Sequence, residues 1–144
     1  MEESFSKEAI LARLRGIPAE RALGYRVEEM SPGHVVMVAP YDPTFAGIYQ
    51  SFHGGLLATL ADSAGGTAAL TLIGAEAATA TTELTVRFLA PCRTDARATA
   101  RVIKCGRTIV ISEINIHDMN GEHCAVCHAS YIRLRRKESR QDGK

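Results

Sequence analysis

The chain has 144 residues, of which 46% are hydrophobic and 23% are charged. This length and composition are typical of one globular domain, and they exclude a disordered chain, a collagen-like chain and a two-domain enzyme. The 17 basic and 16 acidic residues leave a net charge of +1, so the composition gives no support for a nucleic-acid or membrane-surface partner.

The N-terminus is acidic and contains no apolar run of the length that a signal peptide needs. We therefore expect a cytoplasmic protein. Its four cysteines would then be reduced.

The first third of the chain predicts two helices, a hairpin and a loop. An amphipathic pattern that Ser4 or Ser6 could cap, and that Gly16 could end, indicates the first helix. Ser31-Pro32-Gly33 is a turn signal between two strand-like runs. The expected elements are helices over 4–16 and 18–23, strands over 25–30 and 34–40, and a loop over 41–53.

Residues 54–73 predict a long helix that is apolar on almost every side. Such a helix is buried in the centre of a domain instead of lying on its surface. Its single charged residue, Asp62, would be costly in lipid, so we do not expect a membrane span. The pair Gly65-Gly66 would let another stretch of backbone come close.

The second half predicts strands, because apolar residues alternate with polar ones. Leu84, Val86 and Phe88 would share one face of the first strand. A sheet wrapped around the long helix would bury both, an α+β arrangement called the hotdog fold. The expected strands cover 79–90, 94–104, 107–118 and 123–135, and the expected parts are a helical segment over 1–23, a hotdog domain over 24–136 and a disordered basic tail over 137–144.

The motif His53-Gly54-Gly55 lies where the loop meets the helix, and Asp62 follows Gly54 by eight residues. Free N–H groups at a helix start, together with the helix dipole, would polarise a carbonyl such as that of a thioester. Asp62 would activate water as a general base or attack the carbonyl directly. An equally favoured alternative is a tight turn at the glycines and a satisfied buried carboxylate at Asp62.

Helix geometry adds a constraint to the functional interpretation. At about 1.5 Å per residue, roughly 12 Å of helix separates Gly54 from Asp62. One carbonyl carbon cannot be reached from both residues of one chain. If both act, Asp62 must meet the Gly54 of a second chain, so this interpretation predicts a dimer.

The segments FHGGLLATLADSAGGTAALTL and TTELTVRFLAP carry a resemblance to a known family. They resemble the hotdog-fold acyl-CoA thioesterases of the phenylacetate-pathway type, which are relatives of the 4-hydroxybenzoyl-CoA thioesterases. The likeness covers roughly residues 24–134. It implies hydrolysis of an acyl- or aryl-CoA thioester without a metal or redox cofactor, coenzyme A being part of the substrate. It also implies a homodimer, or a tetramer of two dimers.

The resemblance assigns roles to individual residues. Gly54 would donate its N–H to the carbonyl, Asp62 of the partner subunit would activate water, and His53 would support the loop. Many members carry Asn six residues before the motif His, where this chain has Gly47, and Gln50 is the candidate to replace it. The substrate-binding residues would be Gly55, Thr81 or Thr82 beside the water, and Lys104, Gly106 and Arg107 at the coenzyme A entrance.

Other functions remain open at this point. A non-catalytic acyl-CoA-binding protein is the main alternative because the family Asn is missing. An enoyl-CoA hydratase is weaker, since no Asp lies within five residues of His53. The run from Cys124 to His128 formally matches a c-type haem motif, but we interpret it as strand residues that pack as small hydrophobes. An acyl tunnel is expected between two central helices, lined by Leu57, Leu60 and Phe88.

Overall fold

The structure is a computed structural model that describes residues 5–135. The tail expected over 137–144 and the possible cap Ser4 lie outside the described residues. The elements in chain order are α1 (Lys7–Arg15), α2 (Pro18–Leu23), β1 (Arg26–Ser31), β2 (His34–Ala39), the 3-10 turn η1 (Pro43–Phe45), α3 (Gly54–Ile73), β3 (Thr79–Phe88), β4 (Ala96–Cys105), β5 (Ile109–Asp118) and β6 (His123–Arg133).

Capping residues explain where the helices begin and end. The Ser6 hydroxyl accepts a hydrogen bond from the N–H of Ala9 at 3.3 Å, which satisfies one of the free donors at the start of α1. Gly24 ends α2 at a φ of 73°, a conformation that glycine adopts without strain. Gly74, with a φ of 106°, ends α3. The bounds of α3 are those that the sequence predicts.

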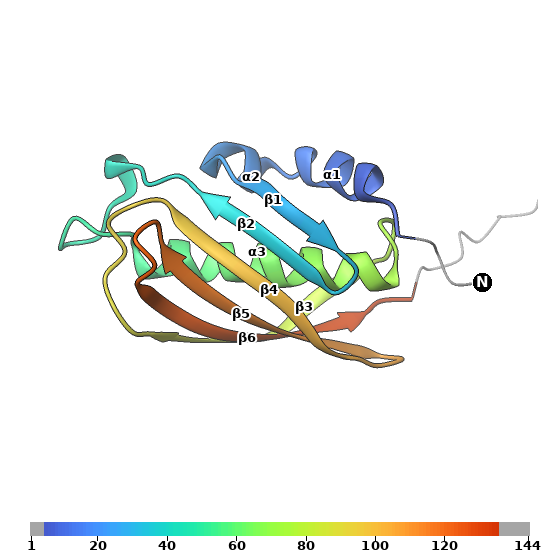
Figure 1. Ribbon diagram of the computed structural model, residues 1–144. Helices are drawn as coiled ribbons and strands as arrows, with labels where there is room; N and C mark the ends of the chain where they lie inside the picture. Colours follow the sequence, from blue (N-terminus) through green and yellow to red (C-terminus); the bar gives the residue numbers. More distant parts are fainter. Residues whose placement is uncertain (1–4, 136–144) are drawn as a thin grey trace, which may run out of the picture.

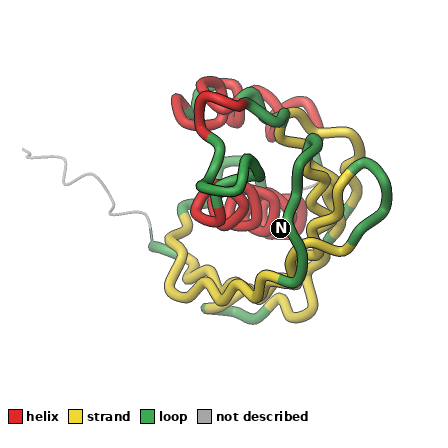
Figure 2. The backbone as a smooth tube through the Cα atoms, turned by 90° about the vertical axis from the view of Figure 1, so that its left-hand side faces the viewer, coloured by secondary structure: helices red, strands yellow, loops and turns green. Residues whose placement is uncertain are grey.

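The six strands form one antiparallel sheet in the order β1-β2-β4-β5-β6-β3. The chain enters β3 directly after α3. This strand is one edge of the sheet, and β1 is the other edge (Figure 1). Figure 2 shows that the strands curve around α3 but leave one side of it uncovered by strands. This is the hotdog fold that the sequence predicts.

A single core joins α3 to the sheet. The face of β4 that contacts it is built from Ala96, Ala98 and Ala100, all fully buried, so the helix can lie close to the strand. Ile10 and Leu14 of α1 belong to the same core. With a mean hydropathy of 1.4, α3 is long and apolar enough for a membrane span, but most of this apolar surface is buried inside the domain.

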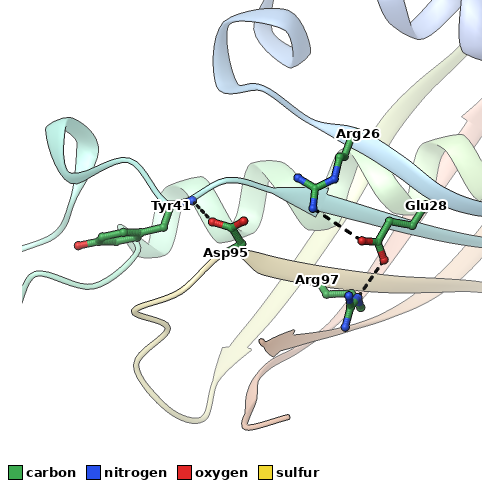
Figure 3. A network of polar contacts seen from close by, with 5 residues as sticks. All are labelled: Arg26, Glu28, Tyr41, Asp95 and Arg97. Carbon is green, nitrogen blue, oxygen red and sulfur yellow. Dashed lines mark hydrogen bonds and ion pairs between the residues drawn. The ribbon is translucent and has the colours of Figure 1, made fainter. Parts of the chain in front are cut away.

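Polar contacts on the outer face of the sheet link β1 to β4 across β2. Glu28 contacts Arg26 at 3.7 Å and Arg97 at 3.1 Å (Figure 3). Val38 of β2 is directly opposite Arg26 of β1 and Arg97 of β4 in the sheet, and it is fully buried. Exposed ion pairs add little stability by themselves, so the long side chains act here mainly by covering Val38.

Candidate active site

The loop before α3 is held at both ends by the segment that precedes β4. The N–H of Tyr41 donates to Asp95 Oδ1 at 2.8 Å (Figure 3), and the N–H of Phe52 donates to the Cys92 carbonyl at 2.7 Å. The Tyr41 hydroxyl donates to the carbonyl of Gln50. Gln50 has a φ of 52°, a left-handed conformation that costs a residue with a side chain about 1 kcal/mol or more. The loop is therefore held in one strained shape that presents the start of α3.

His53 caps α3 and leaves one N–H group of the helix free. Its Nδ1 accepts a hydrogen bond from the N–H of Gly55 at 3.1 Å, and its carbonyl accepts one from the N–H of Leu56 at 2.9 Å. Because Nδ1 is an acceptor, the proton of the neutral ring is on Nε2. The N–H of Gly54 has no hydrogen-bond partner within residues 5–135. It is a free donor at the positive end of the helix dipole.

Asp62 is half-buried on a side of α3 where Gly55, Thr59 and Gly66 are also exposed or partly exposed. The hydroxyl of Thr81, in β3, donates to Asp62 Oδ1 at 2.8 Å. The carboxylate is thus oriented by a neighbouring strand and still accessible, as a general base must be.

A β-bulge decides which of the two threonines reaches Asp62. The register between β3 and β6 shifts between Thr81 and Glu83, so Thr82 is the extra residue. A bulge interrupts the alternation of side chains and can redirect one of them. The hydroxyl of Thr82 donates to the carbonyl of Ser130 at 3.2 Å instead. Of the two candidates, Thr81 contacts the carboxylate and Thr82 does not.

An apolar hollow of about 290 Å³ opens beside Gly54. Phe88, at the end of β3, lies against this glycine and forms one wall. Of the three residues predicted to line an acyl tunnel, Leu57 and Phe88 line this hollow, whereas Leu60 is fully buried against the core of the same chain. A helix that is apolar on all sides does not reveal which side its own sheet covers. The other lining residues include Tyr49, Phe52, Cys92 and Arg93.

The hairpin between β4 and β5 carries the residues expected at the coenzyme A entrance. A Cβ on Gly106 would lie 2.8 Å from the Ile109 carbonyl oxygen, so the turn requires glycine. Lys104 and Arg107 are exposed and form no ion pair within residues 5–135. Ile132 of β6 pairs with Ile109 on one side and with Ala80 on the other, so the hairpin adjoins the Asp62 end of β3 and not the Gly54 end.

Gln50, the residue predicted to replace the family Asn, has less support. Gln50 points to solvent, and its side chain makes no hydrogen bond to any described residue. Gly47 forms backbone hydrogen bonds with Ser51 and Gln50 that close the turn. Within residues 5–135, no hydrogen bond of its side chain supports Gln50 in place of the family Asn, and its role stays a prediction.

The sequence analysis missed Tyr131, a buried residue of β6. Its hydroxyl donates to the backbone carbonyl of Asp62 at 2.8 Å. Burial, with a further contribution from Asp62, raises the pKa of this phenol, so it stays a protonated donor. The feature of the sequence that points to this contact is the pair Gly65-Gly66, because the missing side chains leave room for the tyrosine ring. Within residues 5–135, the atoms nearest to a Cβ on either glycine belong to side chains and not to backbone.

Cys124 and Cys127 of β6 belong to the buried core. Within residues 5–135, no three or more His, Cys, Asp or Glu side chains gather as metal ligands would. Cys124 and Cys127 are fully buried, and burial raises the pKa of Cys127 to about 11. This environment supports packing as small hydrophobes.

Three comparisons describe what the chain is similar to. Residues 49–125 match the model of the Thioesterase superfamily. A Saccharolobus solfataricus protein that bears an esterase name is 31% identical over 116 residues, covering 80% of this chain and 82% of that protein. The crystal structure of a thioesterase family protein from Silicibacter pomeroyi has a TM-score of 0.83 at 30% identity, and the match covers 88% of this chain and 96% of that chain. The structure of the E. coli PaaI protein, from the phenylacetic acid degradation operon, has a TM-score of 0.82 at 25% identity, and the match covers 89% of this chain and 92% of that chain.

Proposed function

Because this chain belongs to the thioesterase superfamily, we propose that it hydrolyses an acyl- or aryl-CoA thioester to the free acid and coenzyme A. The observation that carries the proposal is the arrangement on α3. A free N–H at Gly54 and an accessible carboxylate at Asp62, held by Thr81, are the donor and the base that thioester hydrolysis needs.

The proposed reaction is an attack of water on the thioester carbonyl carbon. The Asp62 carboxylate removes a proton from the water as the carbon–oxygen bond forms, and the Gly54 N–H stabilises the negative carbonyl oxygen. The carbon–sulfur bond then breaks, and the proton held by Asp62 passes to the departing thiolate. Direct attack by Asp62 is the alternative route to the same products. Every group in this scheme is a protein group, so we propose that no cofactor is needed.

We propose further that each active site is shared by two chains. Both groups lie on one helix, separated by about 12 Å. β3 is an edge strand of ten residues, and such an edge offers unpaired N–H and carbonyl groups to another strand. Thr81 contacts Asp62 and Phe88 contacts Gly54, so this strand links both groups. Antiparallel pairing of two β3 edges about an axis between Leu84 and Thr85 would bring Thr81 to the Phe88 position of the partner.

Such pairing would place Asp62 of one chain near Gly54 of the other. The acyl group would then occupy the hollow beside Gly54, and coenzyme A would leave past the hairpin that carries Lys104 and Arg107. Two such dimers would form the proposed tetramer. We propose a cytoplasmic location because all four cysteines are free thiols.

Thiol release from a panel of acyl- and aryl-CoA thioesters tests this function. We expect turnover by the wild type and a loss of about 100-fold or more in kcat for Asp62→Asn, as for removal of a general base. Glu29→Gln, an exposed acid of β1, is the matched control and should keep wild-type activity. Tight binding without turnover would instead favour the non-catalytic acyl-CoA-binding protein, which the absence of the family Asn supports.

A further inference from the structure

One cross-strand pair holds Asp62 by both its side chain and its backbone. Thr81 of β3 and Tyr131 of β6 are directly opposite each other in the sheet register. The Thr81 hydroxyl donates to the carboxylate oxygen Oδ1 and the Tyr131 hydroxyl donates to the backbone carbonyl, each at 2.8 Å. Opposite residues of a strand pair face the same side of the sheet, which is why both reach one residue of α3.

The two glycines that follow Asp62 make room for Tyr131. A Cβ on Gly65 would lie 2.5 Å from the tyrosine oxygen, and a Cβ on Gly66 would lie 3.3 Å from Cε1 of the ring. The hydroxyl of Ser112, in β5, donates to the carbonyl of Gly65 at 3.0 Å. The hydroxyls of Tyr131 and Ser112 thus bind the backbone carbonyls of Asp62 and Gly65, which are one turn apart in α3. These two hydrogen bonds fix the rotation of α3 and its distance from the sheet.

We propose that Tyr131 is a positioning residue for the reaction, acting through Asp62. The proposal rests on the proposed function, in which Asp62 is the base. The hydroxyl of Tyr131 holds the Asp62 backbone at the height where Thr81 meets the carboxylate. Without it, the carboxylate loses alignment with the attacking water while the substrate pocket is unchanged. Because Tyr131 is buried, with 3% of its surface exposed, it would act through Asp62 and not by contact with substrate.

Tyr131→Phe tests the proposal because it removes the hydroxyl and keeps the ring against Gly66. We expect kcat, referred to folded protein, to fall by about two- to tenfold with KM unchanged, as for the loss of one hydrogen bond in the transition state. In the Asp62→Asn background the same substitution should change kcat no further, since both act through one group. A merely structural role would lower activity equally in both backgrounds.

Two matched controls separate positioning from stability. Tyr25→Phe removes another buried hydroxyl, one that has no hydrogen-bond partner among residues 5–135, and should leave kcat unchanged. Ser112→Ala removes a buried hydrogen bond to α3 at Gly65 and should lower Tm with a smaller effect on kcat. If Tyr131→Phe does not fold, Gly65→Ala replaces it: its Cβ would lie 2.5 Å from the tyrosine oxygen and would displace the hydroxyl, so kcat, referred to folded protein, should fall with KM unchanged.

The outcomes distinguish this inference from the function on which it rests. If Asp62→Asn retains wild-type kcat, the proposed mechanism fails. If Asp62→Asn is inactive but Tyr131→Phe keeps wild-type kcat, only the positioning role is overturned. An equal loss from Tyr131→Phe in the wild-type and Asp62→Asn backgrounds would also overturn it.

Discussion

Phe88 packs directly on Gly54, so the last residue of β3 covers the first residue of α3. A Cβ added to Gly54 would lie 3.0 Å from Cζ of the ring. This contact leaves little room for a side chain at the helix start. A single contact between α3 and β3 therefore places both the proposed oxyanion donor and one wall of the hollow beside it.

The role of the Gly54 N–H can be tested with two substitutions at this position. Gly54→Pro removes the N–H, and proline is tolerated at the first position of a helix. Gly54→Ala keeps the N–H and adds the same first carbon beside Phe88, so it is the control for crowding. We expect kcat of the proline variant to be about 100- to 1,000-fold below that of the alanine variant, as for loss of an oxyanion donor. Equal kcat values for the two variants would exclude the N–H as that donor.

The two glycines beside Tyr131 should differ in their tolerance of alanine. Gly65→Ala places a Cβ 2.5 Å from the Tyr131 oxygen and 3.0 Å from Ile114 Cδ1, and such overpacking costs about 1–3 kcal/mol. Gly66→Ala meets only the ring edge at 3.3 Å, and alanine gains up to about 1 kcal/mol in a helix. Urea unfolding should show a clear loss for Gly65→Ala and little change for Gly66→Ala. Equal losses would mean that the close contact is absent.

The sequence predicts the fold better than it predicts the site. The start and end of α3 were predictable, because composition changes at Gly54 and at Gly74. The choice between Thr81 and Thr82 was not, because it depends on a bulge that neither residue type reveals. Tyr131 was not predictable either, since paired glycines in a helix indicate a close approach but not what approaches.

Glu20, a buried acid of α2, should make stability depend on pH. Burial raises the pKa of Glu20 above its ordinary value of 4.5, although a hydrogen bond from Ser63 opposes the shift. Its stabilising contribution is therefore complete below pH 4.5 and is lost as pH rises through the folded-state pKa. Glu20→Gln is neutral at every pH and keeps an acceptor for Ser63. Its Tm should exceed that of the wild type at pH 7 and approach it at pH 4.

A thermal melt of both proteins at the two pH values checks this expectation. Glu29→Gln, an exposed acid of β1, is the control and should show no such pH-dependent difference. A Tm difference between Glu20→Gln and the wild type that is the same at pH 4 and pH 7 would contradict the account of the buried carboxyl.

The central claim, that each site takes Gly54 from one chain and Asp62 from another, is tested most directly by mixing two inactive variants. Gly54→Pro and Asp62→Asn are unfolded together in equal amounts, refolded, and assayed for thiol release. Random pairing makes half of the dimers mixed, and each mixed dimer holds one intact site out of two. Activity should therefore return to about a quarter of the wild-type value. Activity no greater than that of the separately refolded parents would contradict the shared site.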